Sequence, residues 1–189
     1  MFKEIKIRLR RQLADKYGSA RGFLLYYKYR ILALLGRFKR YKKIEWKSVN
    51  RLVFVCKGNI CRSPYAEAVA RSMNIDTVSC GLDTHNGKPA NDNAIRNASK
   101  RGINLSSHKT RQLASVNISE HDLIVVMEPI QAIQVEQMLG MGVNCTVLGL
   151  WNDAGSPYLH DPYGASDAYF SVCYGAIEKS VKNLTTNLR

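Results

Sequence analysis

The sequence predicts an α/β domain with a parallel four-stranded sheet, helices on both faces of that sheet, and a helical N-terminal extension. Short apolar runs alternate with helical segments in the second part of the chain, which is typical of parallel strands covered on both faces. The charge is divided in the same way. Residues 1–50 hold 15 Lys or Arg and 3 Asp or Glu, whereas residues 51–189 hold 13 and 12. We therefore expect a basic extension at 1–50 and a nearly neutral domain at 51–189.

The extension has helical spacing. Residues 2–16 predict a basic helix, and Gly18, Ser19 and Gly22 mark its join to a second helix. Apolar residues then recur at steps of three and four: Leu24, Tyr27, Ile31, Leu34, Leu35, Phe38 and Tyr41. Lys and Arg take most of the remaining positions, so the second helix is expected to be amphipathic and to continue to residue 41.

Four short apolar runs of the domain predict strands: 52–55, 77–79, 123–127 and 144–148. Helices are expected from Ser63-Pro64 onward and at 91–101, 129–139 and 166–182. A long loop, 149–164, precedes the last of them. Because ligands of parallel α/β sheets bind beyond the carboxyl ends of the strands, the loop after the first strand is the first candidate for a site.

That loop predicts an anion-binding site with a nucleophile. It consists of Cys56, Lys57, Gly58, Asn59, Ile60, Cys61, Arg62 and Ser63. Backbone N–H groups in a tight turn, followed by a helix N-terminus, attract an anion. Gly58 permits close approach and Asn59 tolerates left-handed backbone. Arg62 can hold two phosphoryl oxygens through its planar guanidinium, and Cys56 is expected to be a thiolate in this positive field.

Other ligands fit this loop less well. No Lys-Ser or Lys-Thr follows the glycine, which argues against a nucleoside triphosphate. No second Cys/His pair accompanies Cys56 and Cys61, so neither a metal nor another cofactor is expected. The five cysteines are irregularly spaced, which indicates a reducing compartment. We expect a cytoplasmic protein, either free or peripheral at the inner face of the membrane, rather than one with a secretory signal or an organelle transit peptide.

The segment from Val55 to Glu67 resembles the active-site signature of the low-molecular-weight protein tyrosine phosphatases. His160-Asp161-Pro162-Tyr163 resembles the late Asp-Pro-Tyr motif of that family, and the resemblance covers roughly residues 51–185. It is strongest to bacterial members that act on tyrosine kinases of exopolysaccharide and capsule export. Residues 1–50 have no counterpart in the family pattern.

The resemblance implies residue roles. Cys56 would attack phosphorus, Arg62 would hold the phosphoryl oxygens, and Asp161 would act first as acid and then as base. Supporting roles or substrate contacts are implied for Ser63, Asn59, His108 and Tyr163, with His85, Tyr158 and Trp151 as weaker candidates for the substrate wall. Plainer alternatives remain: Ser63 as a helix cap, His108 as a structural histidine, Lys57 as a solvated lysine, and Cys61 as a buried thiol rather than the disulfide partner of Cys56 that the family allows.

Two other functions are compatible with this fold class but fit the sequence less well. An arsenate reductase would need further cysteines, and the 127–129 segment has none. A binding module for phosphoproteins would lack Cys56, Arg62 or Asp161, and all three are present. The extension is expected to lie on an anionic membrane surface, to dock on an acidic partner such as the tail of a membrane tyrosine kinase, or to pack on the domain or a second copy in a homodimer. Nucleic acid is the least expected partner, because no recognition motif accompanies the charge.

Overall fold

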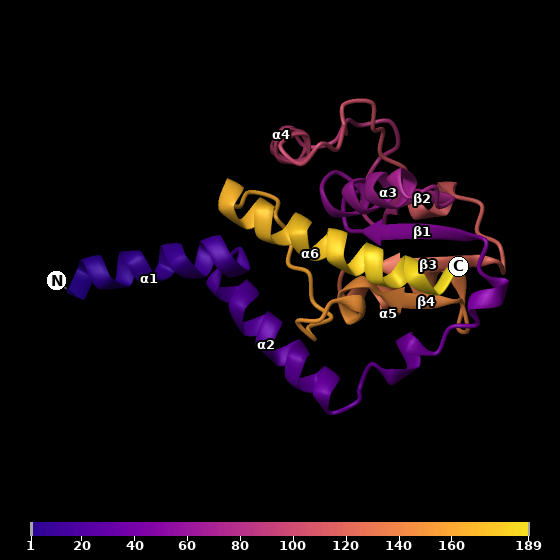
Figure 1. Cartoon of the computed structure of the whole chain (residues 1–189), viewed down its shortest axis with the longest axis horizontal. Helices are drawn as coiled ribbons and strands as arrows, with labels where there is room; N and C mark the ends of the chain where they lie inside the picture. The colour runs from indigo at the N-terminus through magenta and orange to yellow at the C-terminus, as the bar shows by residue number, and fades with distance from the viewer. Residues whose placement is uncertain (1, 189) are drawn as a thin grey trace.

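A computed structural model describes residues 2–188 of the chain (Figure 1). The sheet has four parallel strands in the order β2-β1-β3-β4, which confirms the predicted fold class. The strands are β1 (Arg51–Cys56), β2 (Thr77–Gly81), β3 (Asp122–Val126) and β4 (Cys145–Val147). With β1 and β3 at its centre, the sheet brings the carboxyl ends of all four strands to one edge.

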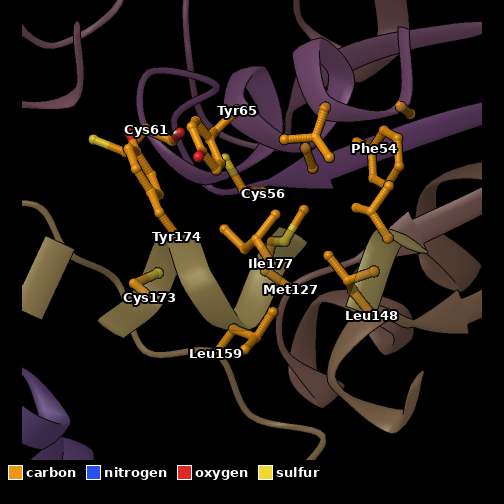
Figure 2. Close-up of a cluster of buried hydrophobic side chains, with 14 of the residues drawn as sticks. Phe54, Cys56, Cys61, Tyr65, Met127, Leu148, Leu159, Cys173, Tyr174 and Ile177 are labelled. Atoms are coloured by element: carbon orange, nitrogen blue, oxygen red, sulfur yellow. Dashed lines mark hydrogen bonds between the residues drawn. The ribbon is translucent and has the colours of Figure 1, made fainter. Parts of the chain in front are cut away.

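Helices cover both faces of the sheet. They are α3 (Arg62–Ser72), α4 (Asp92–Ser99), α5 (Pro129–Leu139) and α6 (Asp167–Thr185). Successive residues of a strand point to opposite faces. Leu52 and Phe54 thus belong to one buried cluster, with α3, α4 and α6, whereas Val53 and Val55 belong to a second, with α5. Figure 2 shows the first cluster, in which Tyr174 and Ile177 of α6 lie opposite Cys56 and Tyr65.

The extension forms two helices, α1 (Phe2–Tyr17) and α2 (Ala20–Leu34). Ser19 caps α2, because its side-chain oxygen accepts a hydrogen bond from the backbone N–H of Gly22. In Figure 1, α1 extends away from the sheet, α2 descends from its end, and the segment after α2 leads back beneath the domain to β1. Within residues 2–188, no helix has the length and apolar character needed to cross a membrane.

The expectation that the second helix continues to residue 41 is wrong. It ends at Leu34, and Gly36 adopts a left-handed φ of 77°, which a helix does not accommodate. The chain then forms a short 3-10 turn, Lys39–Lys42, that buries Tyr41 in the second cluster to 5% exposure. The segment after Gly36 is therefore part of the domain's core, although its charge resembles that of the extension.

Candidate active site

The loop between β1 and α3 folds around the sulfur of Cys56, the last residue of β1. The backbone N–H of Asn59 donates to Cys56 Sγ at 3.2 Å, and Ser63 Oγ lies 3.0 Å from the same sulfur. Cys56 is only 3% exposed. A sulfur held by these two contacts is fixed in position at the start of α3, where the helix N-terminus favours negative charge.

Asn59 ties the loop to its surroundings. Its φ of 53° is left-handed, as the sequence predicted it could be. Its amide nitrogen donates to Ser63 Oγ and to Ser79 Oγ, each at 2.9 Å. Its amide oxygen accepts from the backbone N–H of Arg111, and its backbone oxygen accepts from His108 Nε2, again at 2.9 Å in each case. The conformation of the loop is thus set by contacts from three other segments.

His108 is neutral in this role. Burial lowers its pKa below the ordinary value. Because a carbonyl oxygen only accepts, Nε2 must carry the proton that it shares with Asn59. The ring is therefore a hydrogen-bonded support for the loop in this structure, and it does not line the cavity described below.

Arg62 is a buried cation between two carboxylates. Its Nη1 donates to Glu128 Oε1 at 2.6 Å and to Leu159 O at 2.9 Å, and its Nη2 lies 2.8 Å from Asp161 Oδ2. Burial by itself would lower the pKa of Arg62, but the charges of Asp161 and Glu128 outweigh it and raise that pKa further. Among the described residues, its Nε has no hydrogen-bond partner. A buried N–H without an acceptor is costly, so this donor suits an incoming anion.

One cavity of about 220 Å³ brings most of the predicted loop residues together with Asp161, although the buried Asn59 and Ser63 do not line it. Its lining consists of Cys56, Lys57, Gly58, Ile60, Cys61, Arg62, Asp83, Asp161 and Tyr163. The Asp161 side chain is 39% exposed, and its Oδ1 accepts a hydrogen bond from the backbone N–H of Tyr163. Tyr163 is 64% exposed. Cys56, Arg62, Asp161 and Tyr163 therefore line the same opening.

Three candidates for the substrate wall lie elsewhere. His85 is exposed in the loop after β2 and does not line the cavity. Trp151 packs edge to face on Trp46, with ring centroids 5.2 Å apart. Tyr158 is buried, and its hydroxyl is 2.7 Å from His160 Nδ1. None of the three contributes a surface to the opening in this structure.

Sequence reasoning missed Glu128 and Asp83. Glu128 follows β3, the central neighbour of β1, so its side chain reaches the same edge of the sheet as Arg62. Asp83 follows β2, the other neighbour of β1. The available signal was topological, because residues just beyond the carboxyl ends of adjacent parallel strands converge.

Cys61 lines the cavity as a neutral thiol. Burial, and then the negative charge of Asp161, raise its pKa well above the ordinary value. It is a free cysteine here, as is Cys56. Disulfide formation between these two residues stays a prediction.

This geometry is suited to transfer of a phosphoryl group. The sulfur of Cys56, the guanidinium of Arg62 and the carboxylate of Asp161 line the same cavity, and a backbone N–H donates to the sulfur. Donors held in place before the reaction stabilise charge that develops on phosphoryl oxygens.

Comparison with known proteins agrees with this geometry. A model of the family "low molecular weight phosphotyrosine protein phosphatase" matches residues 51–189. The Escherichia coli K12 low molecular weight protein-tyrosine-phosphatase Wzb is 32% identical over 137 residues, which cover 70% of this chain and 91% of Wzb. EpsP of Ralstonia nicotianae, described as a probable low molecular weight protein-tyrosine-phosphatase, is 34% identical over 90 residues. That match spans 47% of this chain and only 62% of EpsP.

Solved structures show the same relationship. Wzb of Vibrio vulnificus, in complex with benzylphosphonate, superimposes with a TM-score of 0.66 at 30% identity, over 73% of this chain and 98% of that one. The match of the family model includes the sheet, the Cys56–Ser63 loop and Asp161. The chain therefore belongs to the low molecular weight phosphotyrosine protein phosphatase family.

Proposed function

We propose that the chain hydrolyses phosphotyrosine in proteins through a phosphocysteine intermediate. The observation that carries this proposal is the shared cavity of Cys56, Arg62 and Asp161, with Arg62 bound directly to Asp161. Benzylphosphonate, the ligand of the Vibrio vulnificus relative, joins an aromatic ring to a tetrahedral oxyanion, as phosphotyrosine does. The exposed ring of Tyr163 at the opening supports an aromatic substrate.

In the first step the thiolate of Cys56 attacks phosphorus, and the bond from phosphorus to the phenolic oxygen breaks. Asp161 gives its proton to the departing phenolate. In the second step Asp161 takes a proton from water, the resulting hydroxide attacks phosphorus, and the sulfur–phosphorus bond breaks to release inorganic phosphate and the thiolate. Ser63, which lies 3.0 Å from the sulfur, stabilises the thiolate as it leaves.

Arg62 changes partners in this scheme. Glu128 and Leu159 O anchor Nη1, so Nε and Nη2 remain for two phosphoryl oxygens. When the phosphoryl group enters, Nη2 exchanges Asp161 for an oxygen of the substrate. That exchange frees the Asp161 carboxylate from the cation, so that it can take up a proton from solvent and deliver it to the leaving group.

Steady-state hydrolysis of para-nitrophenyl phosphate and of a phosphotyrosine peptide tests this proposal. Cys56→Ser should abolish turnover and Asp161→Ala should lower kcat by roughly 10²–10⁴-fold. Cys145→Ser is the matched control, because this buried cysteine of β4 lies in the second cluster, away from the cavity. Turnover by Cys56→Ser would contradict the mechanism, whereas an inactive wild type would contradict the function.

We further propose that the extension lies on an anionic membrane, where the substrate would be a membrane-bound tyrosine kinase of polysaccharide export. Four apolar residues of α2 and the turn after it stay exposed: Leu24 at 66%, Ile31 at 56%, Leu34 at 81% and Leu35 at 71%. Lys28, Arg30 and Arg37 are exposed on the same segment. An apolar stripe flanked by cations is typical of helices that lie in a membrane interface.

Co-sedimentation with vesicles tests the membrane proposal on the full chain. Truncation at residue 48 would remove the buried Tyr41, so substitutions are the better perturbation. The triple variant Leu24→Ser, Ile31→Ser and Leu35→Ser should lose binding to vesicles with phosphatidylglycerol, which wild type should bind. The control is Ile130→Ser with Ile133→Ser, which replaces two exposed apolar residues of α5. Equal vesicle binding by wild type and the triple variant, or no binding by wild type, would refute membrane association. A dimeric wild type together with a monomeric triple variant would indicate that the stripe is a homodimer interface instead.

A further inference from the structure

The extension contacts the loop that carries Asp161 at both ends of that loop. Near its start, Ser156 Oγ donates to Tyr26 O of α2 at 3.1 Å. At its end, Ser166 Oγ donates to Asp15 Oδ1 of α1 at 2.7 Å. These contacts join residues more than a hundred positions apart in the chain, so the loop from 156 to 166 is held between the domain and the extension.

A further contact involves His160, the residue before Asp161. Its Nε2 lies 3.1 Å from Ser19 Oγ at the turn between α1 and α2, and its Nδ1 lies 2.7 Å from Tyr158 OH. Tyr158 in turn stacks on Tyr29 of α2, with ring centroids 5.4 Å apart and an interplanar angle of 18°. Both ring nitrogens of His160 are therefore occupied, one of them by the extension.

The steric fit around this imidazole is close. Gly18 has a φ of 79°, and a Cβ at that position would lie 2.4 Å from His160 Cδ2. A Cβ at Gly22 would lie 2.0 Å from the backbone oxygen of Tyr17 and 2.9 Å from the same His160 atom. Real Cβ atoms do not approach other heavy atoms so closely, so only glycine allows the turn to sit against the ring. The close fit at Gly18 and Gly22 and the hydrogen bond with Ser19 together hold the turn against the imidazole.

From these contacts we propose that the extension positions Asp161 for its proton transfer, with Ser19 and Gly18 acting through His160. This inference rests on the proposed role of Asp161 as the acid. The side chain of Asp161 is held by Arg62 and by the backbone N–H of Tyr163. Once Arg62 turns to the phosphoryl group, the location of the carboxyl group depends on the backbone at 160–161, which the imidazole anchors. Small displacements of a catalytic group are costly, on the order of 10²-fold for about 1 Å.

The dependence of kcat/KM on the leaving group distinguishes positioning of an acid from general damage. A substrate with a poor leaving group, such as phenyl phosphate, needs the proton, whereas 2,4-dinitrophenyl phosphate does not. Ser19→Ala should slow the first substrate by roughly 2–10-fold, the effect of one hydrogen bond, and should change the second less than twofold. Gly18→Ala should show the same selectivity with a larger loss, because it forces the turn away from the ring.

Matched controls exist within the extension. Ser48→Ala removes a hydroxyl that bonds only within its own turn, to Glu45 O. Gly36→Ala alters another glycine of positive φ, whose Cβ would meet only the flexible side chain of Lys39. Neither should change the leaving-group dependence. Asp161→Asn sets the scale, since loss of the acid itself should give the steepest dependence.

The outcomes separate the two proposals. If Asp161→Asn steepens the dependence and Ser19→Ala does not, the extension does not position the acid. If Ser19→Ala and Gly18→Ala lower kcat/KM equally for phenyl phosphate and for 2,4-dinitrophenyl phosphate, the contact is structural and the inference is refuted. If Asp161→Asn leaves the dependence unchanged, the proposed role of Asp161 fails, and the inference fails with it. Ser19→Ala keeps the test valid even where Gly18→Ala does not fold. It introduces no steric clash and removes one hydroxyl oxygen, with its hydrogen bonds to His160 and to the backbone N–H of Gly22.

Discussion

Glu128 has a measurable role that follows from the burial of Arg62. Arg62 is 1% exposed and its guanidinium has two carboxylates against it, Asp161 and Glu128. Glu128→Gln keeps the shape of the side chain and an oxygen for Nη1 but removes one of these two charges. A hydrogen bond to a charged partner is worth about 1.5–3 kcal/mol and a neutral one about 0.5–1.5 kcal/mol, so the unfolding free energy should fall by about 1–2 kcal/mol.

The larger cost of leaving a buried charge unpaired, about 3–5 kcal/mol, does not apply here. Asp161 still lies 2.8 Å from Nη2 in the variant, so Arg62 keeps one counter-charge. Inorganic phosphate should stabilise Glu128→Gln more than it stabilises wild type. In the variant the bound dianion supplies the missing negative charge beside Arg62, and it is not repelled by a carboxylate at position 128.

Urea denaturation with and without phosphate measures both effects. Glu136→Gln is the control, because it neutralises a second glutamate of the same region, on α5, whose partner Arg40 is 54% exposed. Pairs with an exposed partner contribute about 0–1 kcal/mol. If Glu128→Gln lowers stability no more than Glu136→Gln, or if phosphate stabilises wild type and Glu128→Gln equally, then Glu128 does not balance the charge of Arg62 and the electrostatic account is refuted.

Three further predictions concern the core, the pH dependence and the thiols. Tyr41→Ala should lower the unfolding free energy by about 3 kcal/mol, because a buried aromatic side chain is lost, whereas Tyr163→Ala should cost less than about 0.5 kcal/mol; chemical denaturation compares them. Burial would raise the pKa of Asp122, but hydrogen bonding to Arg51 outweighs burial and lowers that pKa below its ordinary value. The Asp122–Arg51 pair therefore stabilises the fold at pH values above the ordinary pKa of Asp, and this stabilisation is lost as the pH falls through the pKa of the folded state. Acid unfolding of Asp122→Asn should therefore depend less on pH below about 4 than that of wild type. Iodoacetamide at neutral pH should label Cys56 and spare Cys80, Cys145 and Cys173, whose pKa values burial raises to about 12; mass spectrometry that finds equal labelling would contradict this.

The elements of the domain could be predicted from the sequence because each strand is a short apolar run and each helix has a recognisable start. Pro129, for example, opens α5 directly after Glu128. The sequence marks Glu128 only as the residue that precedes this helix, so its contact with Arg62 was not predicted. Its contact with Arg62 arises because β3 lies beside β1, and pairing of strands far apart in the chain is not encoded in any local pattern.

The extension shows a different limit of sequence reasoning. The three- and four-residue spacing of apolar residues identified α2. The same spacing continues to Tyr41, but the helix does not, because the left-handed backbone of Gly36 is incompatible with a continuing helix. Periodicity also does not say which face of a helix meets the protein. The apolar stripe would ordinarily be taken as the packing face, but α2 packs through Gly22, Tyr26 and Tyr29, and the stripe stays exposed.

The two faces of α2 make the two proposals for the extension compatible. Leu24, Ile31 and Leu35 are exposed at spacings of seven and four residues along the segment, and a patch of exposed apolar side chains marks an interaction surface. Ser19 and Gly22 meet His160 from another side of the same segment, so a membrane can cover the stripe without displacing the turn from the imidazole. Substitutions in the stripe should therefore change vesicle binding and leave the leaving-group dependence unchanged, and Ser19→Ala should do the reverse. A stripe variant that changed both would show that the contact with His160 depends on how the outer face is covered, and the extension would then link membrane binding to catalysis.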